Sequence, residues 1–163
     1  MPEAVISDTS PLQYLHQLGQ LHLLPHFYHQ IIVPPTVERE LAVGLSLGVA
    51  LPVPATLPWL RVRAPAPAQT VRLATTLGRG EREVLASALE IPDALVLMDD
   101  GQARRVGRLL GLTMTGTVGI LARATREGLL PPLAPMLDRL AALGFRLSAE
   151  ARATALRLVG EGW

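Results

Sequence analysis

Cysteine and lysine are both absent from this chain of 163 residues. Without cysteine there are no disulfides, thiolate metal sites or cysteine nucleophiles. Aromatic residues make up only 4% of the sequence, so few side chains are available to stack on nucleobases. The formal net charge of +1 gives no overall basic field. Any argument for a nucleic-acid partner therefore has to come from local clusters of residues.

Long apolar runs and several familiar motifs are absent as well. No uninterrupted apolar stretch approaches the roughly 18 residues that a membrane span needs, and the N-terminus lacks the layout of a signal peptide. There is no P-loop, no Gly-x-Gly-x-x-Gly fingerprint and no convincing Ser–His–Asp triad. We therefore expect a soluble cytoplasmic protein. Its mean hydropathy of +0.32 predicts a large core and leaves apolar surface that suits a homo-oligomer interface.

Short apolar runs alternate with helical patterns along the chain. Strands are predicted at residues 4–7, 31–33, 59–63, 95–98 and 112–115, and helices at 10–18, 21–28, 35–45, 70–77, 81–89, 101–110 and 117–127. This alternation predicts an α/β protein, a three-layer α/β/α sandwich with a mainly parallel central sheet. Two further helical patterns, 132–143 and 148–159, predict a C-terminal helical hairpin. We accordingly expect one domain, with a main body over residues 1–130 and a C-terminal helical extension over 131–163 packed on it.

Local signals predict several details of the helices. Ser10 is placed as the N-cap of the first helix. Gly111 and Gly128 are expected to end two later helices, because glycine readily adopts the left-handed conformation found there. On the helix over 81–89, Glu83 lies off the apolar stripe, so we expect it to point to solvent.

Carboxylates directly follow two of the predicted strands. Asp8 comes after the first strand, and Asp99 and Asp100 follow the fourth. Because ligands bind where the carboxyl ends of parallel strands meet, we expect these acids to lie close together. Clustered carboxylates repel one another, and a hard divalent cation with oxygen ligands is the simplest compensation. The alternative is that each acid only caps the following helix, although Asp99 and Asp100 cannot both be the cap.

Two helices add further acids to this argument. Glu81 lies on the apolar stripe of its helix, which is unusual for an acid, although the macrodipole also favours a carboxylate in the first turn. On the helix over 35–45, spacing alone does not choose between Glu38 and Glu40. At this point the sequence predicts an acidic metal site to which one of those two glutamates contributes.

Basic residues form one face of the helix over 101–110. Leu110 is expected to point inward, whereas Arg104, Arg105 and Arg108 are expected to point outward. Arginines beside an acidic metal site suit substrate phosphates. The alternative is an ordinary solvated face.

Other polar clusters support narrower hypotheses. Thr117 begins a helix after a strand and a glycine, where backbone N–H groups and a hydroxyl suit an anion or a metal-bound water, but it also suits an N-cap. His22, His26 and His29 have near-helical spacing, yet a proline interrupts that helix and no fourth zinc ligand is evident. A phosphotransfer domain of the receiver type is disfavoured because the chain has no lysine.

Five segments, taken in order, resemble the motifs of PIN-domain proteins. They are Val5–Leu12, Val33–Leu41, Leu77–Leu85, Leu97–Val106 and Thr113–Gly119. The resemblance covers about residues 4–128, and a C-terminal hairpin also occurs in a subgroup of predicted nucleic-acid-binding PIN proteins. Many PIN toxins place a single acid near the fourth motif, whereas this chain has two. The resemblance implies a PIN-like fold and an Mg²⁺- or Mn²⁺-dependent endoribonuclease, often the VapC-like toxin of a toxin–antitoxin pair.

The resemblance also implies roles for individual residues. The catalytic and metal-ligating acids would be Asp8, Glu40, Glu81, Asp99 and Asp100. Thr9 and Thr117 would orient water or phosphate, and Arg104 and Arg105 are weaker candidates for phosphate contacts. The implied partners are an RNA substrate, a cognate antitoxin protein and a second copy of the chain. The alternative is a catalytically silent PIN-fold interaction module, since the apolar surplus and near-neutral charge suit protein partners.

Overall fold

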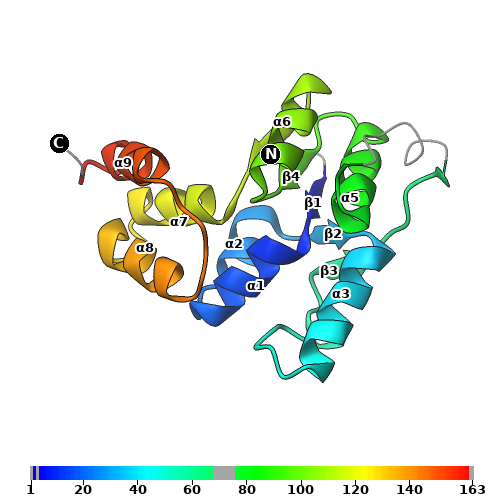
Figure 1. Ribbon diagram of the computed structural model, residues 1–163, viewed down its shortest axis with the longest axis horizontal. Helices are drawn as coiled ribbons and strands as arrows, with labels where there is room; N and C mark the ends of the chain where they lie inside the picture. Colours follow the sequence, from blue (N-terminus) through cyan, green and yellow to red (C-terminus); the bar gives the residue numbers. More distant parts are fainter. Residues whose placement is uncertain (1, 3, 68–75, 162–163) are drawn as a thin grey trace.

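A five-stranded parallel sheet forms the centre of the protein, for which a computed structural model describes residues 2, 4–67 and 76–161 (Figure 1). Its strands are β1 (Val5–Ser7), β2 (Ile31–Val33), β3 (Leu60–Val62), β4 (Leu95–Leu97) and β5 (Thr113–Thr115). Their order across the sheet is β3-β2-β1-β4-β5, and every pair is parallel. The two strands that end in acids, β1 and β4, are therefore neighbours at the middle of the sheet.

Helices cover the sheet on both faces, which confirms the predicted three-layer α/β/α arrangement. They are α1 (Thr9–Gln17), α2 (Leu23–Tyr28), α3 (Pro35–Ser46), α5 (Arg79–Leu89), α6 (Gly101–Leu109), α7 (Thr117–Arg126), α8 (Leu133–Ala142) and α9 (Ala149–Leu158), with a 3-10 turn at Pro54–Thr56. Figure 1 shows α3 and α5 on one side of the molecule, and α7, α8 and α9 on the other. The helix expected over residues 70–77 falls almost entirely outside the described residues.

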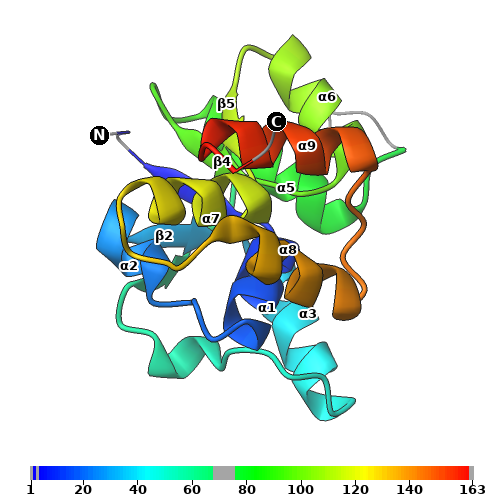
Figure 2. The same cartoon turned by 90° about the vertical axis from the view of Figure 1, so that its left-hand side faces the viewer.

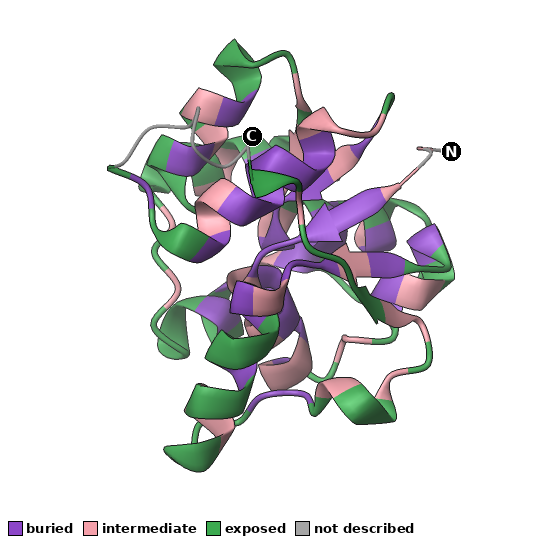
Figure 3. Cartoon of the chain, turned by 90° about the vertical axis from the view of Figure 1, so that its right-hand side faces the viewer, coloured by how far each residue is buried: buried purple, intermediate pink, exposed green. Residues whose placement is uncertain are grey.

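The core follows the sheet, whose central strands are the most deeply buried part of the chain (Figure 3). Ile6 in β1 and Val96 in β4 are fully buried and pair with each other across the ladder. Strands covered on both faces must be apolar on both faces, which is why these runs lack alternation. Helix α5 packs directly on β1 and β4, so its first turn lies beside the strand ends that carry the acids.

The C-terminal hairpin packs on the body through α7. Helices α8 and α9 both contact α7, as the view in Figure 2 also shows. Leu133, Leu137 and Leu140 of α8 are fully buried. The Glu161 carboxylate accepts hydrogen bonds from the N–H groups of Leu133 and Ala134, at 2.6 and 3.1 Å, which satisfies the start of α8. Among the described residues, no helix has the length and apolar character needed to cross a bilayer.

Some sequence-based details of the helices are confirmed and others are wrong. Gly111 and Gly128 follow α6 and α7 with φ of +80° and +76°, as expected for glycines that end helices. Ser10 is not the N-cap of α1, because the helix begins at Thr9 and Asp8 occupies the cap position. Glu83 is buried, since nearly the whole circumference of α5 is covered. Leu110 is 39% exposed because it lies beyond the end of α6, where the helical period no longer applies.

Candidate functional site

Asp8 lies at the carboxyl end of β1 and is almost completely buried, with 8% of its surface exposed. Its N–H donates to the carbonyl of Leu97 at 3.0 Å, which extends the pairing of β1 with β4. Its side chain makes no capping hydrogen bond to α1, so the capping alternative does not explain it. Burial, followed by the charges of Glu81, Glu40 and Asp99, raises the pKa of Asp8 to about 7. Glu81, Glu40 and Asp99 are therefore near enough for their charges to act on Asp8.

Glu40 is the glutamate of α3 that faces this cluster. The Thr9 hydroxyl donates a short hydrogen bond to Oε2 of Glu40. The Glu40 carboxylate also lies against Gly80 at the start of α5, where an added Cβ would come within 2.7 Å of Oε1. A glycine at this position therefore leaves room for the acid. Glu38, by contrast, lines a separate surface hollow beside residues 54–62.

Glu81 has a structural role and also faces the other acids. Its Oε1 accepts from the N–H of Gly78 at 3.2 Å, which caps the first turn of α5. Its Oε2 is buried and has no hydrogen-bond partner among the described residues. Burial, followed by the charge of Asp100 and then by the charge of Glu40, raises the pKa of Glu81. Glu81 thus has the role at the helix start that the sequence anticipated, and its second oxygen is buried without a partner among the described residues.

The two adjacent acids that follow β4 have different roles. Asp100 caps α6, because its Oδ2 accepts from the N–H of Ala103 at 2.9 Å. Asp99 turns toward the strand ends instead, where its Oδ2 accepts from the Ser10 hydroxyl at 2.6 Å. The N–H and hydroxyl of Thr117 both donate to Asp99, each at 2.7 Å. Asp99 is therefore positioned by three donors from α1 and α7.

Thr117 and its neighbour Gly116 determine how Asp99 is held. Thr117 is fully buried and is the first residue of α7, so Gly116 and not Thr117 occupies the N-cap position. An added Cβ on Gly116 would meet Oδ1 of Asp99 at 2.6 Å and the carbonyl of Met98 at 3.0 Å. Any side chain at position 116 would push Asp99 out of place.

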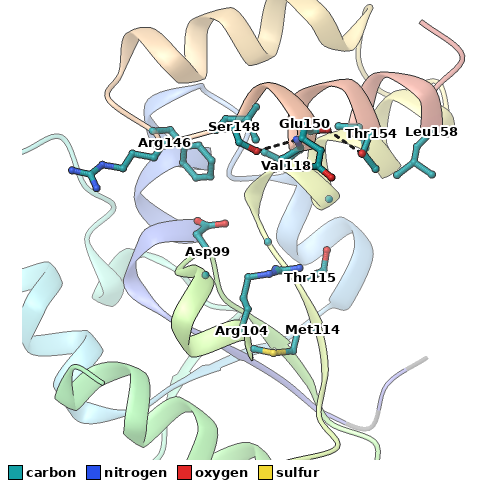
Figure 4. A pocket seen from close by; sticks show the side chains of 18 of the residues that line it. Asp99, Arg104, Met114, Thr115, Val118, Arg146, Ser148, Glu150, Thr154 and Leu158 are labelled. Atoms are coloured by element: carbon teal, nitrogen blue, oxygen red, sulfur yellow. Dashed lines mark hydrogen bonds between the residues drawn. The ribbon is translucent and has the colours of Figure 1, made fainter. Parts of the chain in front are cut away.

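The three arginines of α6 differ in their surroundings. Arg104 is half-buried and its guanidinium donates to the carbonyl of Met98 at 2.8 Å, so the outward orientation expected for it is wrong. Arg104 and Arg108 line a cavity of about 670 Å³ that begins at Asp99 (Figure 4). Arg105 is exposed and does not line that cavity.

Sequence reasoning missed the residues that support these acids. The pattern assigns Ser10 to a helix cap, yet it binds Asp99 across 89 positions of the chain. Gly80 and Gly116 had no assigned role, although each leaves space for a carboxylate. In the sequence, each of these residues is only a small residue next to an acid or at the start of a helix. That position does not indicate which carboxylate the residue contacts.

The side chains that could bind a metal at this edge of the sheet offer carboxylate and hydroxyl oxygens. Such oxygen ligands suit Mg²⁺ or Mn²⁺ and do not suit soft metals. The buried, unpaired oxygen of Glu81 and the repulsion that raises the pKa of Asp8 both fit a cation as the missing partner. Within the described ranges, no three His, Cys, Asp or Glu side chains already stand close enough to form a finished metal site.

A family model described as a PIN domain matches residues 4–161, which is nearly the whole chain. No curated protein and no solved structure matches the sequence. PIN domains are generally nucleases, and the family generally uses divalent metals. The fold described above, with acids at the ends of two adjacent parallel strands, agrees with this match. The chain therefore belongs to the PIN domain family.

Proposed function

We propose that this protein is a metal-dependent endoribonuclease that hydrolyses RNA phosphodiesters at the acid cluster. The observation that carries the proposal is the position of Asp8, a buried carboxylate on which the charges of three other acids act. Family membership supplies the general reaction, because PIN domains are generally nucleases. Mg²⁺ or Mn²⁺ held there would neutralise the phosphodiester charge and lower the pKa of a bound water.

The hydrogen bonds favour different roles for the five acids. Asp8, Glu40 and Glu81 come from β1, α3 and α5, and in our proposal they are the principal metal ligands. Asp99 is fixed by three donors and serves as the ligand with the most rigid position. Asp100 already caps α6, so we assign it to the outer part of the site, where its charge acts on Glu81. A bound cation must draw these carboxylates closer together than they lie in its absence.

The two threonines act by holding carboxylates in position. Thr9 holds Glu40 and Thr117 holds Asp99, so we propose that both keep carboxylates oriented for the metal. Hydrolysis by a water at this site leaves a 5′-phosphate and a 3′-hydroxyl. Arg104, half-buried beside Asp99, is the cation closest to the scissile phosphate in this scheme.

The deciding experiment is calorimetric titration of Mn²⁺ into the wild type, Asp8→Asn and Glu38→Gln, followed by cleavage assays on single-stranded RNA. Glu38→Gln is the matched control, because it removes an exposed acid of α3 that faces away from the cluster. We expect Asp8→Asn to abolish Mn²⁺ binding and cleavage while retaining the fold, and Glu38→Gln to behave as the wild type. A wild type that binds no Mn²⁺ would refute the proposal and favour the silent interaction module.

We also propose that this ribonuclease acts as the toxin of a toxin–antitoxin pair and associates with itself. Family membership supports the first part, and exposed apolar side chains support the second. Val43 and Leu47, at the end of α3, are 57% and 76% exposed. Induced expression should arrest bacterial growth for the wild type and not for Asp8→Asn. Light scattering of the purified protein should give a mass above that of one chain, and a monomeric mass contradicts self-association.

A further inference from the structure

A hollow adjoins the acid cluster, and of the residues that line it the proposed nuclease chemistry uses only Asp99 and Arg104. This cavity of about 670 Å³ lies between α6, β5 and the start of α7 on one side and residues 145–158 of the C-terminal hairpin on the other. Figure 4 shows Arg104, Met114 and Thr115 along one wall and the side chains of α9 along the opposite wall. The hairpin therefore supplies half of a binding site as well as covering α7.

The two walls differ in chemistry. The wall formed by α7 and α9 carries the apolar Val118, Ala122 and Leu158 together with the polar Glu150 and Thr154. The wall formed by α6 carries Arg104 and Arg108, one helical turn apart. Neither guanidinium forms an ion pair within the described part of the chain. Burial and then repulsion from the charge of Arg108 lower the pKa of Arg104, whereas the charge of Asp99 raises it. An anion between them would relieve that repulsion.

Asp99 connects this cavity to the acid cluster. Its carboxylate is held by Ser10 and Thr117 at the strand ends, and the same residue lines the cavity. A molecule in the cavity is therefore next to any group bound at the acids. The chemistry required of that molecule is an anionic group near the arginines and a flat apolar or weakly polar group against α7 and α9.

We propose that this cavity binds one nucleotide of the single-stranded RNA substrate, next to the phosphodiester that is cleaved, and the inference rests on the function proposed above. The phosphate of this nucleotide lies between Arg104 and Arg108, and its base lies against the wall formed by α7 and α9. The volume falls within the roughly 300–1,000 Å³ typical of sites for small organic ligands. A base reaches such a pocket only when it is unstacked, so the substrate is single-stranded. The hairpin thus selects for unpaired RNA.

Two variants test the two walls separately. Arg108→Ala removes the phosphate contact, and Arg126→Ala is its control, because it removes the same charge from an exposed position of α7 outside the cavity. Ala151→Trp fills the cavity from an exposed position on α9, and Ala149→Trp places the same side chain on an exposed residue that does not line it. Neither pair of positions belongs to the acid cluster, so metal binding stays a separate measurement.

The assay is fluorescence anisotropy of a labelled eight-nucleotide single-stranded RNA of mixed sequence, in EDTA so that binding is measured without cleavage. We expect Arg108→Ala to weaken binding about tenfold and to reduce the salt dependence by about one phosphate contact. Ala151→Trp should weaken binding at least as much, and both controls should stay within about twofold of the wild type. Addition of an unlabelled RNA duplex of the same sequence should compete poorly.

Several results overturn the inference. Wild-type affinity in both Arg108→Ala and Ala151→Trp would place the RNA elsewhere. Weaker RNA binding in Arg108→Ala alone would show a phosphate contact without a base in the cavity. Equal competition by the duplex would show that the protein does not select for unpaired RNA. Because Mn²⁺ titration tests the acids independently, intact metal binding with no effect of these variants refutes the subsite only. A wild type that binds no Mn²⁺ refutes the nuclease proposal itself.

Discussion

Replacing Asp8 with asparagine should stabilise the metal-free protein at neutral and alkaline pH. Asp8 is a buried carboxyl whose pKa rises from 3.8 to about 7 on folding. Between these values the folded state binds more protons than the unfolded state, so the free energy of unfolding falls as pH rises through this window. Three units of pKa correspond to about 4 kcal/mol at most, of which roughly 3 kcal/mol is lost between pH 5 and pH 8. The amide side chain of the variant carries no charge and escapes this loss.

Urea unfolding in EDTA at pH 5 and pH 8 measures the effect. The wild type should be less stable at pH 8, and Asp8→Asn should show a smaller change with pH and exceed the wild type at pH 8. Glu38→Gln, which replaces an exposed acid on α3, should keep the wild-type pH dependence. Mn²⁺ should then stabilise the wild type and leave Asp8→Asn unchanged, because ligand binding to the folded state adds to stability. An Asp8→Asn protein that is less stable than the wild type at pH 8 would refute the electrostatic reasoning.

Two further substitutions test how the acids are positioned. Gly80→Ala should displace the Glu40 carboxylate, because the new Cβ would lie 2.7 Å from Oε1, and calorimetry should show weaker Mn²⁺ binding with little change in melting temperature. Gly101→Ala, where a Cβ meets nothing within 4 Å, is the control, and equal affinities for the two variants would contradict the steric argument. Thr117→Val should lower the free energy of unfolding by about 1.5–3 kcal/mol, since it removes a hydrogen bond to the charged Asp99, whereas Thr117→Ser should retain most of it. A Thr117→Val protein as stable as the wild type, measured by urea unfolding, would show that the hydroxyl contributes nothing.

The sequence was most informative where short-range pattern and topology coincide. Apolar runs that end in acids predicted both the parallel sheet and the meeting of Asp8 with Asp99, because parallel strands align their carboxyl ends. Helix ends at Gly111 and Gly128 were predicted from the conformational freedom of glycine, which is a local property. The structure places Glu40, and not Glu38, with the other acids, a choice that helical spacing alone left open.

The remaining errors come from contacts between distant segments. Ser10 has the composition of a helix cap, and nothing near it in sequence indicates a bond to Asp99. Glu83 lies off the apolar stripe of α5, but that helix is covered by more than one neighbour, so a single stripe underestimates its burial. The cavity at Asp99 was equally invisible, because its walls combine α6 with a hairpin about 40 residues later in the chain.

The hydrogen bonds to Asp99 also determine how much of the chain must be synthesised before this carboxylate is held in place. The three donors that hold this carboxylate come from Ser10 and Thr117, so the chain must emerge from the ribosome beyond α7 before Asp99 is fixed. Until then the acids of β1, α3 and α5 lack one wall of their site. Under the function proposed above, the protein would gain activity only after most of its sequence has been translated.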